Sequence, residues 1–303
     1  MSASIGTTEI LRPERFGYLS VQVPDVQKTL DLFVRYFQLE PDKLPDGRVC
    51  VRGQTDSHWV VLEEGPRKRL TRLAFEVNDS DEIDLYAKRL SDRGVPVEQG
   101  FDKQARIGRF VRFNDPDGNP IEFFFGMTQF ATPAPRRAIH STHLLHTVLL
   151  VPDVERSYEF YSDVLGFRAS DWVEDSAVFM HIGNGFHHSL ALMRATSEEG
   201  LDHICFLMED MDDVMRLRAK AINNGIGSRS DVKKHAPSGS ISYYINDTSS
   251  GLVLEACWGH AQIESTSLHR PRVLPKRPET GNLWLASDDG PSSAVMDGPL
   301  GSS

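Results

Sequence analysis

The sequence lacks the features of several specialised protein classes. Its 303 residues hold only three cysteines, Cys50, Cys205 and Cys257, which are widely spaced and form no CxxC pair. An odd number at this spacing argues against a disulfide framework or a cysteine zinc site, so we expect reduced core residues. No apolar run is long enough to cross a bilayer, and no membrane partner is therefore expected.

Positive charge is also scarce. The chain has 33 Lys and Arg against 43 Asp and Glu, a formal net charge of -10, which predicts no nucleic-acid partner. Residues 1–16 have no cationic start followed by an apolar stretch, so we expect no secretion signal there and predict a cytoplasmic protein. The length and the 40% of apolar residues are typical of a globular protein of two domains.

What the sequence does contain is an internal repeat. The segment VQVPDVQKTLDLFVRYFQL in the N-terminal half matches LLVPDVERSYEFYSDVLGF in the C-terminal half. Each has a short apolar run, a Pro-Asp step and then apolar residues at helical spacing, so Asp25 and Asp153 are expected N-caps. Two weaker copies begin at Arg72 and His203, and each ends on a glycine.

The four copies share one spacing. The residue that opens each first strand stands seven positions before the aspartate that precedes the helix. These pairs are Tyr18 and Asp25, Arg72 and Asp79, His146 and Asp153, and His203 and Asp210. Alternating apolar and polar runs between the helices indicate strands, so each copy is predicted to be a strand, a helix and then several strands.

The repeat predicts how the chain divides. We expect an N-terminal domain at residues 10–130, a linker at 131–141 that contains ATPAPRR, and a C-terminal domain at 142–262. A tail at 263–303 is rich in proline, arginine and serine. Its last residues, from Ser287, are expected to be disordered, whereas the run NLWLA at 282–286 is a candidate for docking.

Two histidines and a glutamate indicate a metal site in the C-terminal domain. His146 and His203 hold matching positions in neighbouring modules, so they are expected to face one cavity. Glu255, in LVLEACWG, lies in an alternating run where an unpaired carboxylate would be costly to bury, and it is the expected third ligand. Two imidazoles and one carboxylate are typical of non-haem Fe(II) oxygenases, with open positions for substrate and O2.

The N-terminal half provides a comparison within the chain. At the positions of the two histidines it carries Tyr18 and Arg72, although Glu122 in DPDGNPIEFFFG keeps the carboxylate. An arginine side chain cannot ligate a metal. We therefore predict that only the C-terminal domain binds iron, and that a nearby hydrogen bond satisfies Glu122.

Over about residues 15–260, these features resemble the type I extradiol dioxygenases of the vicinal oxygen chelate superfamily. The most specific stretch is KKHAPSGSISYYINDTSSGLVLE, which carries His235, Tyr244, Gly251 and Glu255 in the family's order. Thr248 stands where the family usually has proline, and the turn before Glu255 is one residue longer. The resemblance implies an α+β fold of two domains, each of two βαβββ modules that form a cup-like half barrel.

The resemblance also implies an activity and its cofactor. The expected enzyme inserts both atoms of O2 into a catechol-type substrate and opens the ring. The expected cofactor is Fe(II), with Mn(II) as the alternative, held by His146, His203 and Glu255. A homo-oligomer is also expected from the family, whereas the ring substituent (biphenyl-type, alkyl or carboxylated) stays open.

Three further residues take catalytic roles by this resemblance. His188, in FHHSLAL, is expected to accept and return the substrate proton, since a histidine near neutral pKa can do both. Tyr244 is expected to hydrogen-bond the bound substrate oxygen, and His235 to contact the substrate. His187 should point to the opposite face from His188. Tyr244 also has the alternative of being a core aromatic residue beside Tyr243.

Two other functions fit the same sequence. The first is another metal-dependent reaction of the superfamily, an isomerase or epimerase, whose sites commonly draw ligands from more than one module. The second is a non-catalytic protein that binds a small aromatic compound in the cup, because a fold alone does not determine function. A single histidine is more often structural than a ligand, and His143, His181 and His260 are assigned as structural or exposed.

Overall fold

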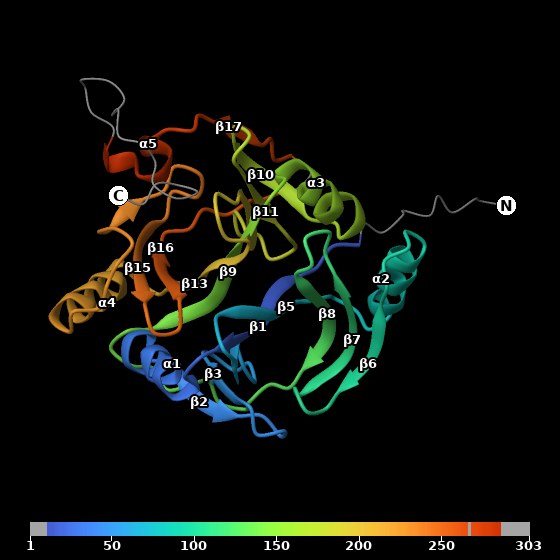
Figure 1. Cartoon of the computed structure of the whole chain (residues 1–303), viewed down its shortest axis with the longest axis horizontal. Coiled ribbons are helices and arrows are strands. Elements are labelled where there is room, and N and C mark those ends of the chain that lie inside the picture. The colour runs from blue at the N-terminus through green and yellow to red at the C-terminus, as the bar shows by residue number, and fades with distance from the viewer. Residues whose placement is uncertain (1–10, 266–267, 286–303) are drawn as a thin grey trace.

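The structure is a computed structural model that describes residues 11–265 and 268–285. Four βαβββ modules follow one another along the chain (Figure 1). The first two modules form an eight-stranded sheet and the last two contribute to a nine-stranded sheet. The predicted α+β fold of paired modules is therefore confirmed.

The N-terminal sheet contains the first and second modules. The first module has β1 (Arg15–Val23), α1 (Val26–Leu32), β2 (Glu40–Lys43), β3 (Val49–Arg52) and β4 (Val60–Glu64). The second has β5 (Arg69–Glu76), α2 (Glu82–Ser91), β6 (Glu98–Asp102), β7 (Ile107–Asn114) and β8 (Pro120–Met127). The strand order is β2-β3-β4-β1-β5-β8-β7-β6, so the first strands of the two modules pair, antiparallel, at the centre.

The C-terminal sheet repeats this plan. The third module has β9 (Ser141–Val151), α3 (Val154–Glu159), β10 (Arg168–Val173), β11 (Ala177–His181) and β12 (Leu190–Arg194). The fourth has β13 (Gly200–Met208), α4 (Met211–Asn223), β14 (Lys233–Lys234), β15 (Ile241–Asp247) and β16 (Leu252–Trp258). The order β14-β15-β16-β13-β9-β12-β11-β10-β17 again places the two first strands, β9 and β13, side by side.

Aspartate side chains begin three of these helices. Asp25, Asp153 and Asp210 each accept a hydrogen bond, of 2.9, 3.1 and 2.9 Å, from the amide three residues on. Such caps satisfy amides that have no partner inside the helix. The second module differs, because Asp79 accepts from the amide of Asp81 instead and α2 starts at Glu82.

Strand pairing shows that the two sheets repeat residue for residue at their centres. In each sheet, one residue on the first strand of the second module pairs on one side with a residue on the first strand of the preceding module. On its other side it pairs with a glutamate on the last strand of its own module. These triplets are Tyr18, Ala74 and Glu122 in the N-terminal sheet, and His146, Cys205 and Glu255 in the C-terminal sheet. The expected equivalence of the four modules is therefore seen in the register itself.

The two sheets share one hydrophobic core. Phe206 of β13 packs against Phe37, with ring centroids 5.0 Å apart, and Phe75 of β5 packs against Phe167 at 5.1 Å. The Tyr86 hydroxyl of α2 also donates to a backbone carbonyl of the C-terminal half at 3.1 Å. This shared core holds the halves against each other, while the domain boundaries expected at residues 130 and 142 stay a prediction.

The segment after the fourth module docks on the C-terminal sheet. Its strand β17 (Arg272–Leu274) pairs in parallel with β10, and α5 (Pro278–Gly281) follows (Figure 1). Asn282 then accepts a hydrogen bond from the amide of Lys234 at 3.2 Å. The docking expected for the run NLWLA is thus confirmed at Asn282, whereas the side chains of Leu283, Trp284 and Leu285 are exposed. Residues 286–303, most of which were expected to be disordered, lie outside the described residues.

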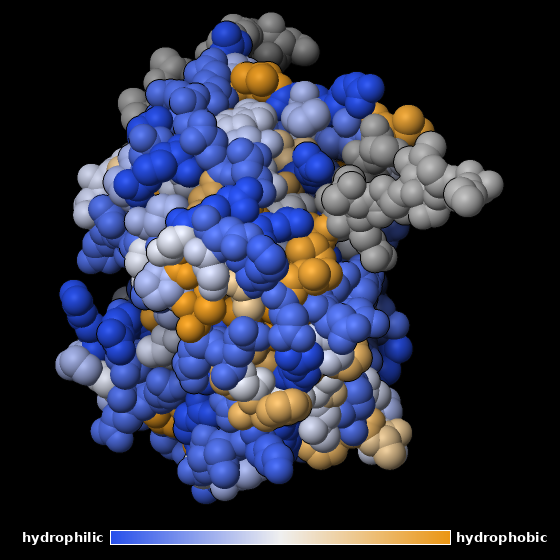
Figure 2. All heavy atoms as spheres, turned by 90° about the vertical axis from the view of Figure 1, so that its right-hand side faces the viewer, coloured by the Kyte–Doolittle hydropathy of each residue, from blue (hydrophilic) through white to orange (hydrophobic). Residues whose placement is uncertain are grey.

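None of the helices in the described part of the chain has the length and apolar character needed to span a bilayer. The face beside α2 and β6 is mainly hydrophilic, with apolar side chains in small areas between polar ones (Figure 2). The three cysteines are buried and unpaired, as expected for reduced core residues.

Substitutions at two glycines, Gly166 and Gly225, test how tightly the residues before β1 pack on the third module. Gly166 has a φ of +84°, and a Cβ there would lie 1.9 Å from the carbonyl oxygen of Leu11. Gly225 has a similar φ of +67° and no atom within 4 Å. Alanine is strained at both positions but clashes at only one. We expect Gly166→Ala to lower the free energy of unfolding by about 1–3 kcal/mol more than Gly225→Ala in urea denaturation. Equal losses would contradict the close contact.

Candidate active site

The structure brings the three predicted metal ligands together at the centre of the C-terminal sheet. His146 on β9, His203 on β13 and Glu255 on β16 are all buried, with at most 5% of each residue exposed. The Nε2 atoms of His146 and His203 lie 3.1 and 3.0 Å from the same oxygen, Oε2 of Glu255. Three donor atoms from three neighbouring strands thus converge on one point.

The charges at this point suit a divalent cation. Burial by itself raises the pKa of Glu255, but hydrogen bonds from His146 and His203 bring it well below its ordinary value. The carboxylate is therefore ionised at neutral pH. Nδ1 of His146 is a buried nitrogen that has no hydrogen-bond partner among the described residues. Two imidazole nitrogens and a carboxylate fit Fe(II), Mn(II) or Zn(II), so the donors alone do not select one metal.

An ion pair behind His203 orients this ring. His203 Nδ1 lies 2.5 Å from Oδ2 of Asp202, and Arg229 donates to both oxygens of that carboxylate, at 2.8 and 2.9 Å. The carboxylate accepts the Nδ1 proton and leaves the Nε2 lone pair for a metal, an arrangement frequent behind metal-bound histidines. Neither Asp202 nor Arg229 was predicted, although Asp202 directly precedes the ligand in the sequence.

A cysteine also lies close to the predicted ligands. The donor atoms of Cys205, His146 and Glu255 are all within 4.8 Å of one another. Burial raises the pKa of the Cys205 thiol well above its ordinary value, and the neighbouring Cys257 raises it further. A metal prefers the thiolate form of cysteine. The protonated thiol is therefore a poorer ligand than the imidazole of His203.

A cavity opens beside the three donors. It is narrow, with a cavity volume of about 30 Å³. Its lining consists of His146, Val148, Phe179, His188, Met193, His203, His235, Pro237, Ser238, Ser240, Tyr244 and Glu255. Among the residues that the structure describes, no lysine or arginine lines this cavity, and its outer wall is largely apolar.

His235 and Tyr244 reach the cavity as a pair. His235 Nε2 and the Tyr244 hydroxyl share a hydrogen bond of 2.8 Å, and the same nitrogen lies 3.7 Å from Oε1 of Glu255. Burial lowers the pKa of His235 to about 4 and raises that of Tyr244 well above its ordinary value. Both groups are therefore neutral at pH 7. Tyr243, the alternative for the site tyrosine, packs in the hydrophobic core instead.

His188 lines the cavity with its ring centroid 4.2 Å from that of His146. The expectation that His187 points to the opposite face is wrong, because its Nδ1 lies 3.0 Å from Nδ1 of His188. Both residues precede β12, where side chains do not alternate as they do in a strand. His260, assigned as structural or exposed, is buried, and its ring packs 4.6 Å from that of His188.

In the N-terminal sheet, protein side chains surround the carboxylate at the equivalent position. Tyr18 donates to Oε1 of Glu122 at 2.6 Å, and Arg112 donates to Oε2 at 2.6 Å. Arg72 lies 3.5 Å from Oε2 of the same carboxylate. The expectation that a hydrogen bond satisfies Glu122 is therefore confirmed. These donors occupy both oxygens, so the carboxylate is fully engaged within the protein.

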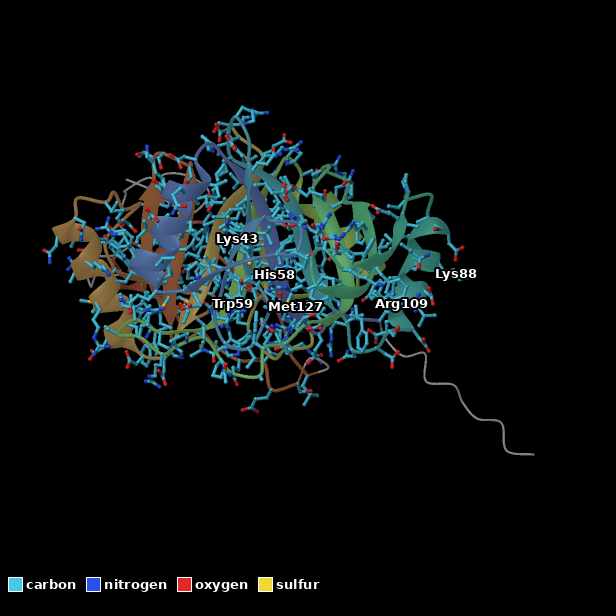
Figure 3. The ribbon with its side chains drawn as sticks, turned by 90° about the horizontal axis from the view of Figure 1, so that it is seen from below. Lys43, His58, Trp59, Lys88, Arg109 and Met127 are labelled. Carbon is cyan, nitrogen blue, oxygen red and sulfur yellow. The ribbon has the colours of Figure 1, made fainter. Side chains whose placement is uncertain are left out.

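His58 is the counterpart of His188 in this half. Two residues after His58, the chain pairs with the residue that follows Tyr18. Two residues after His188, it pairs in the same way with the residue that follows His146. Figure 3 labels His58 next to Trp59 within the N-terminal sheet. Burial lowers the pKa of His58 to about 3, and its ring packs on Tyr18 at 4.5 Å. The sequence analysis did not identify this residue, although an alignment of the residues before β4 with those before β12 could have revealed it.

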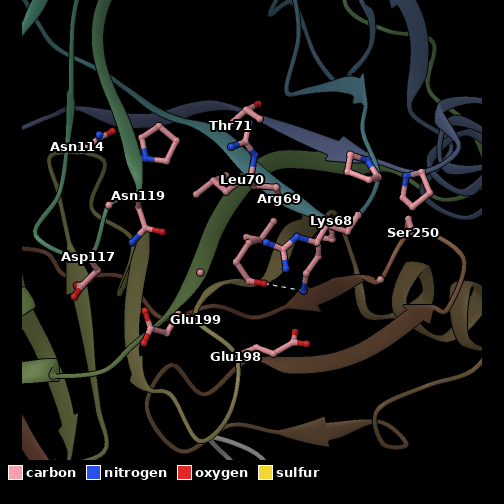
Figure 4. A pocket seen from close by; sticks show the side chains of 18 of the residues that line it. Lys68, Arg69, Leu70, Thr71, Asn114, Asp117, Asn119, Glu198, Glu199 and Ser250 are labelled. Carbon is pink, nitrogen blue, oxygen red and sulfur yellow. Dashed lines mark hydrogen bonds between the residues drawn. The ribbon is translucent and has the colours of Figure 1, made fainter.

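A larger hollow lies elsewhere, between the two halves. It is lined by residues of the β4–β5 turn, such as Lys68, and by Glu198, Glu199 and Ser250 (Figure 4). Lys68 bridges the halves by donating to the carbonyl of Leu201 at 2.9 Å. Its described lining residues include no histidine and no converging set of metal donors, so its size does not make it the reactive site.

The fold defines a class of proteins built from paired βαβββ modules, and one half of this chain carries a set of side chains that can bind a metal. Residues 15–123 and 143–256 match the Glyoxalase/Bleomycin resistance protein/Dioxygenase superfamily. The chain belongs to this family. The two matched segments coincide with the first two and the last two modules, so the superfamily expected from the sequence is confirmed.

Two relatives resemble most of the chain. The chain is 26% identical over 266 residues to the biphenyl-2,3-diol 1,2-dioxygenase of Paraburkholderia xenovorans, covering 82% of this chain and 88% of the relative. It is 28% identical over 230 residues to the iron-dependent extradiol dioxygenase of Rhodococcus jostii, covering 69% and 76%. The Mn(II)-bound glyoxalase from Novosphingobium aromaticivorans has the same fold, with a TM-score of 0.83, 22% identity, and coverage of 96% and 98%.

Replacing Glu122 tests the structural role of the N-terminal carboxylate. Glu122→Ala removes the acceptor of the buried Tyr18 hydroxyl and one of the carboxylates that Arg112 contacts, while Asp102 stays as its partner. We therefore expect a loss of about 1–3 kcal/mol in the free energy of unfolding. Metal content should not change. Asp84→Ala, which breaks an ion pair of Arg109 with an exposed carboxylate, is the control and should cost under about 1 kcal/mol. A folded Glu122→Ala protein with less metal would disprove the assignment of the metal to the C-terminal sheet.

Metal binding should depend on pH through His203. Burial lowers the pKa of this ring, but Asp202 and Glu255 outweigh that effect and raise it. A metal must displace the proton, so affinity should fall as pH drops through the raised pKa, with proton release on binding.

Calorimetry with Zn(II) in buffers of different ionisation enthalpy measures that release. Asp202→Asn should weaken binding by about 10- to 100-fold and shift the pH dependence to lower pH. Asp231→Asn, which removes an exposed partner of Arg218, is the matched control and should bind as the unaltered protein does. An unchanged affinity in Asp202→Asn would show that this carboxylate does not orient the ligand.

Proposed function

We propose that the protein is an Fe(II)-dependent extradiol dioxygenase that opens a catechol-type ring with O2. The single observation that carries this proposal is the convergence of His146, His203 and Glu255 beside a cavity that also contains His188 and Tyr244. Bound there, the metal supplies a Lewis acid with open positions for the catechol and O2. The two sheets are proposed to correspond to domains at 10–130 and 142–262, and a homo-oligomer is proposed from the family.

His188 is the proposed acid and base of the reaction. Burial lowers its pKa well below the ordinary value, and the nearby His146 lowers it further. A neutral imidazole accepts the proton of a catechol hydroxyl and, once protonated, donates it to an oxygen of the product. Its position in the lining of the cavity, against the ring of His146, supports this role.

Tyr244 and His235 are proposed to hold the substrate oxygens. Tyr244 keeps its proton because burial raises its pKa, so its hydroxyl is a hydrogen-bond donor. Its partner His235, at 2.8 Å, fixes the direction in which that hydroxyl points. The pair thus places one oriented donor beside the predicted ligand Glu255.

The apolar residues that line the cavity favour a substrate without a charged substituent. Val148, Phe179, Met193 and Pro237 line the space beside the donors, with no lysine or arginine among the described lining residues. A ring carboxylate would lose its hydration there without gaining a cationic partner. We therefore propose a catechol with an apolar substituent or none, in preference to a carboxylated one.

Isomerase or epimerase activity is the second candidate, because a solved glyoxalase has the same fold. All three proposed ligands here lie in one half of the chain, and Tyr18 and Arg72 replace the histidines in the other. This asymmetry, together with the two dioxygenase relatives, favours ring cleavage.

Loading with Fe(II) without oxygen, followed by catechols and air, tests the activity directly. We expect a yellow ring-fission product and consumption of one O2 per ring, and higher kcat/KM for 3-alkyl or 3-phenyl catechols than for carboxylated ones. Stoichiometric iron without product from any catechol would favour the binding protein. Glyoxalase-type turnover without oxygen uptake would favour the isomerase.

Two substitutions separate the proposed roles. His188→Phe should keep iron and bind catechol but lose at least about 100-fold in kcat, since general acid–base catalysis contributes that much. Glu255→Ala should lose the metal itself, because two histidines alone remain. Metal analysis, catechol binding measured without oxygen and steady-state kinetics distinguish the two. Full activity in His188→Phe would refute its acid–base role.

A further inference from the structure

A chain of hydrogen bonds leads from His188 away from the cavity. Nδ1 of His188 lies 3.0 Å from Nδ1 of His187, and Nε2 of His187 lies 2.9 Å from Oδ2 of Asp171 on β10. Asp171 is completely buried. The hydrogen bonds of this chain involve none of the three proposed metal ligands, although the ring of His188 packs on that of His146.

Arg272 of the docked C-terminal segment completes the chain. Its backbone amide and Nε donate to Oδ1 of Asp171 at 2.9 and 3.0 Å, and Nη2 donates to Oδ2. Nη2 also donates at 2.8 Å to the carbonyl of Pro237, a residue of the cavity wall. Strand β17 lies beside β10 and brings Arg272 into place (Figure 1). A residue outside the four modules therefore holds the buried carboxylate.

The direction of each hydrogen bond follows from the chemistry of its acceptor. An ionised carboxylate only accepts, so the proton between His187 and Asp171 belongs to Nε2 of His187. With the single proton of the ring on Nε2, His187 offers the lone pair of its Nδ1. His188 must donate its own Nδ1 proton to that lone pair, which leaves Nε2 of His188 as the unprotonated nitrogen.

Packing fixes the position of the His188 ring but not its tautomer. The ring lies between Phe179 and His260, with centroids 5.0 and 4.6 Å away. The His188 amide donates to Nε2 of His260 at 3.4 Å, and the His187 amide donates to the carbonyl of Ala261 at 2.8 Å. The backbone and ring are thus held from both sides, and the chain through His187 selects which nitrogen carries the proton.

We propose that His187 and Asp171, held by Arg272, are positioning residues that keep the proton of neutral His188 on Nδ1 and present its Nε2 as a proton acceptor. The inference rests on the acid–base role proposed for His188. It also gives the segment after residue 262 a function, since that segment contributes Arg272. An equivalent chain is known for catalytic histidines that a carboxylate holds in one tautomer.

Substitution of Asp171 should reverse the direction of the hydrogen bonds that link it to His187 and His188. In Asp171→Asn the amide oxygen should face the two donors that now bind Oδ1, so its NH2 group faces His187. That group donates to Nε2 of His187 and moves the proton to Nδ1. His187 then donates to Nδ1 of His188, which must carry its proton on Nε2 and is no longer an acceptor toward the cavity.

Nitrogen-15 NMR of histidine-labelled protein loaded with diamagnetic Zn(II) measures both tautomers. We expect the unaltered protein to show His188 protonated on Nδ1 and His187 on Nε2, and Asp171→Asn to show the reverse. In the Fe(II) enzyme, Asp171→Asn and Arg272→Gln should each lower kcat by about 10- to 100-fold with KM and iron content unchanged. Arg270→Gln, in the same segment, is the control and should keep full kcat, because the hydrogen bond of the Arg270 side chain to the described residues goes to the neighbouring His269 carbonyl.

The outcomes separate this inference from the proposed activity. A proton on Nε2 of His188 in the unaltered protein, or identical tautomers in Asp171→Asn, would overturn the positioning role. Full kcat in both Asp171→Asn and Arg272→Gln would also overturn it. If the iron-loaded protein cleaves no catechol, the proposed function fails, but the NMR measurement still decides the tautomer of His188.

Discussion

The structure depends on how each sheet compensates a carboxylate that it buries at its centre. Glu122 and Glu255 occupy the same register position, and neither is more than 1% exposed. An unpaired charge there would cost several kcal/mol, so each half must surround it with donors. The N-terminal half uses a tyrosine and arginines, which satisfy the carboxylate inside the protein. The C-terminal half uses two histidines, whose lone pairs can instead share a cation.

Buried carboxylates that are surrounded by donors also lie behind two histidines of the C-terminal half. Two of the histidines in the C-terminal half are each backed by a buried aspartate, and each aspartate is paired with an arginine. The pairs are Asp202 with Arg229 behind His203, and Asp171 with Arg272 behind His187. Ionised aspartates accept imidazole protons and so determine which ring nitrogen points inward. One pair serves the proposed metal ligand and the other serves the proposed acid–base residue.

Much of this arrangement was predictable because it repeats along the chain. The seven-residue spacing located His146 and His203, and strand pairing places them as the repeat indicates. Glu255 was predictable because a lone carboxylate interrupts an apolar run. The orientation of His187 was not, since a strand period was applied to a segment that precedes β12. The burial of His260 also gave no signal in the sequence.

The sequence by itself determined the four modules, the three candidate ligands and the replacement of the two histidines by Tyr18 and Arg72 in the N-terminal half. These features are local or periodic, so neighbouring residues and a constant spacing encode them. Only the tertiary structure decided what stands behind the histidines, because those hydrogen bonds join residues with no regular separation. Arg272 lies 101 positions from Asp171, and Arg229 lies 27 from Asp202. Such pairs form only when the docked C-terminal segment and the loop after α4 bring the charges together.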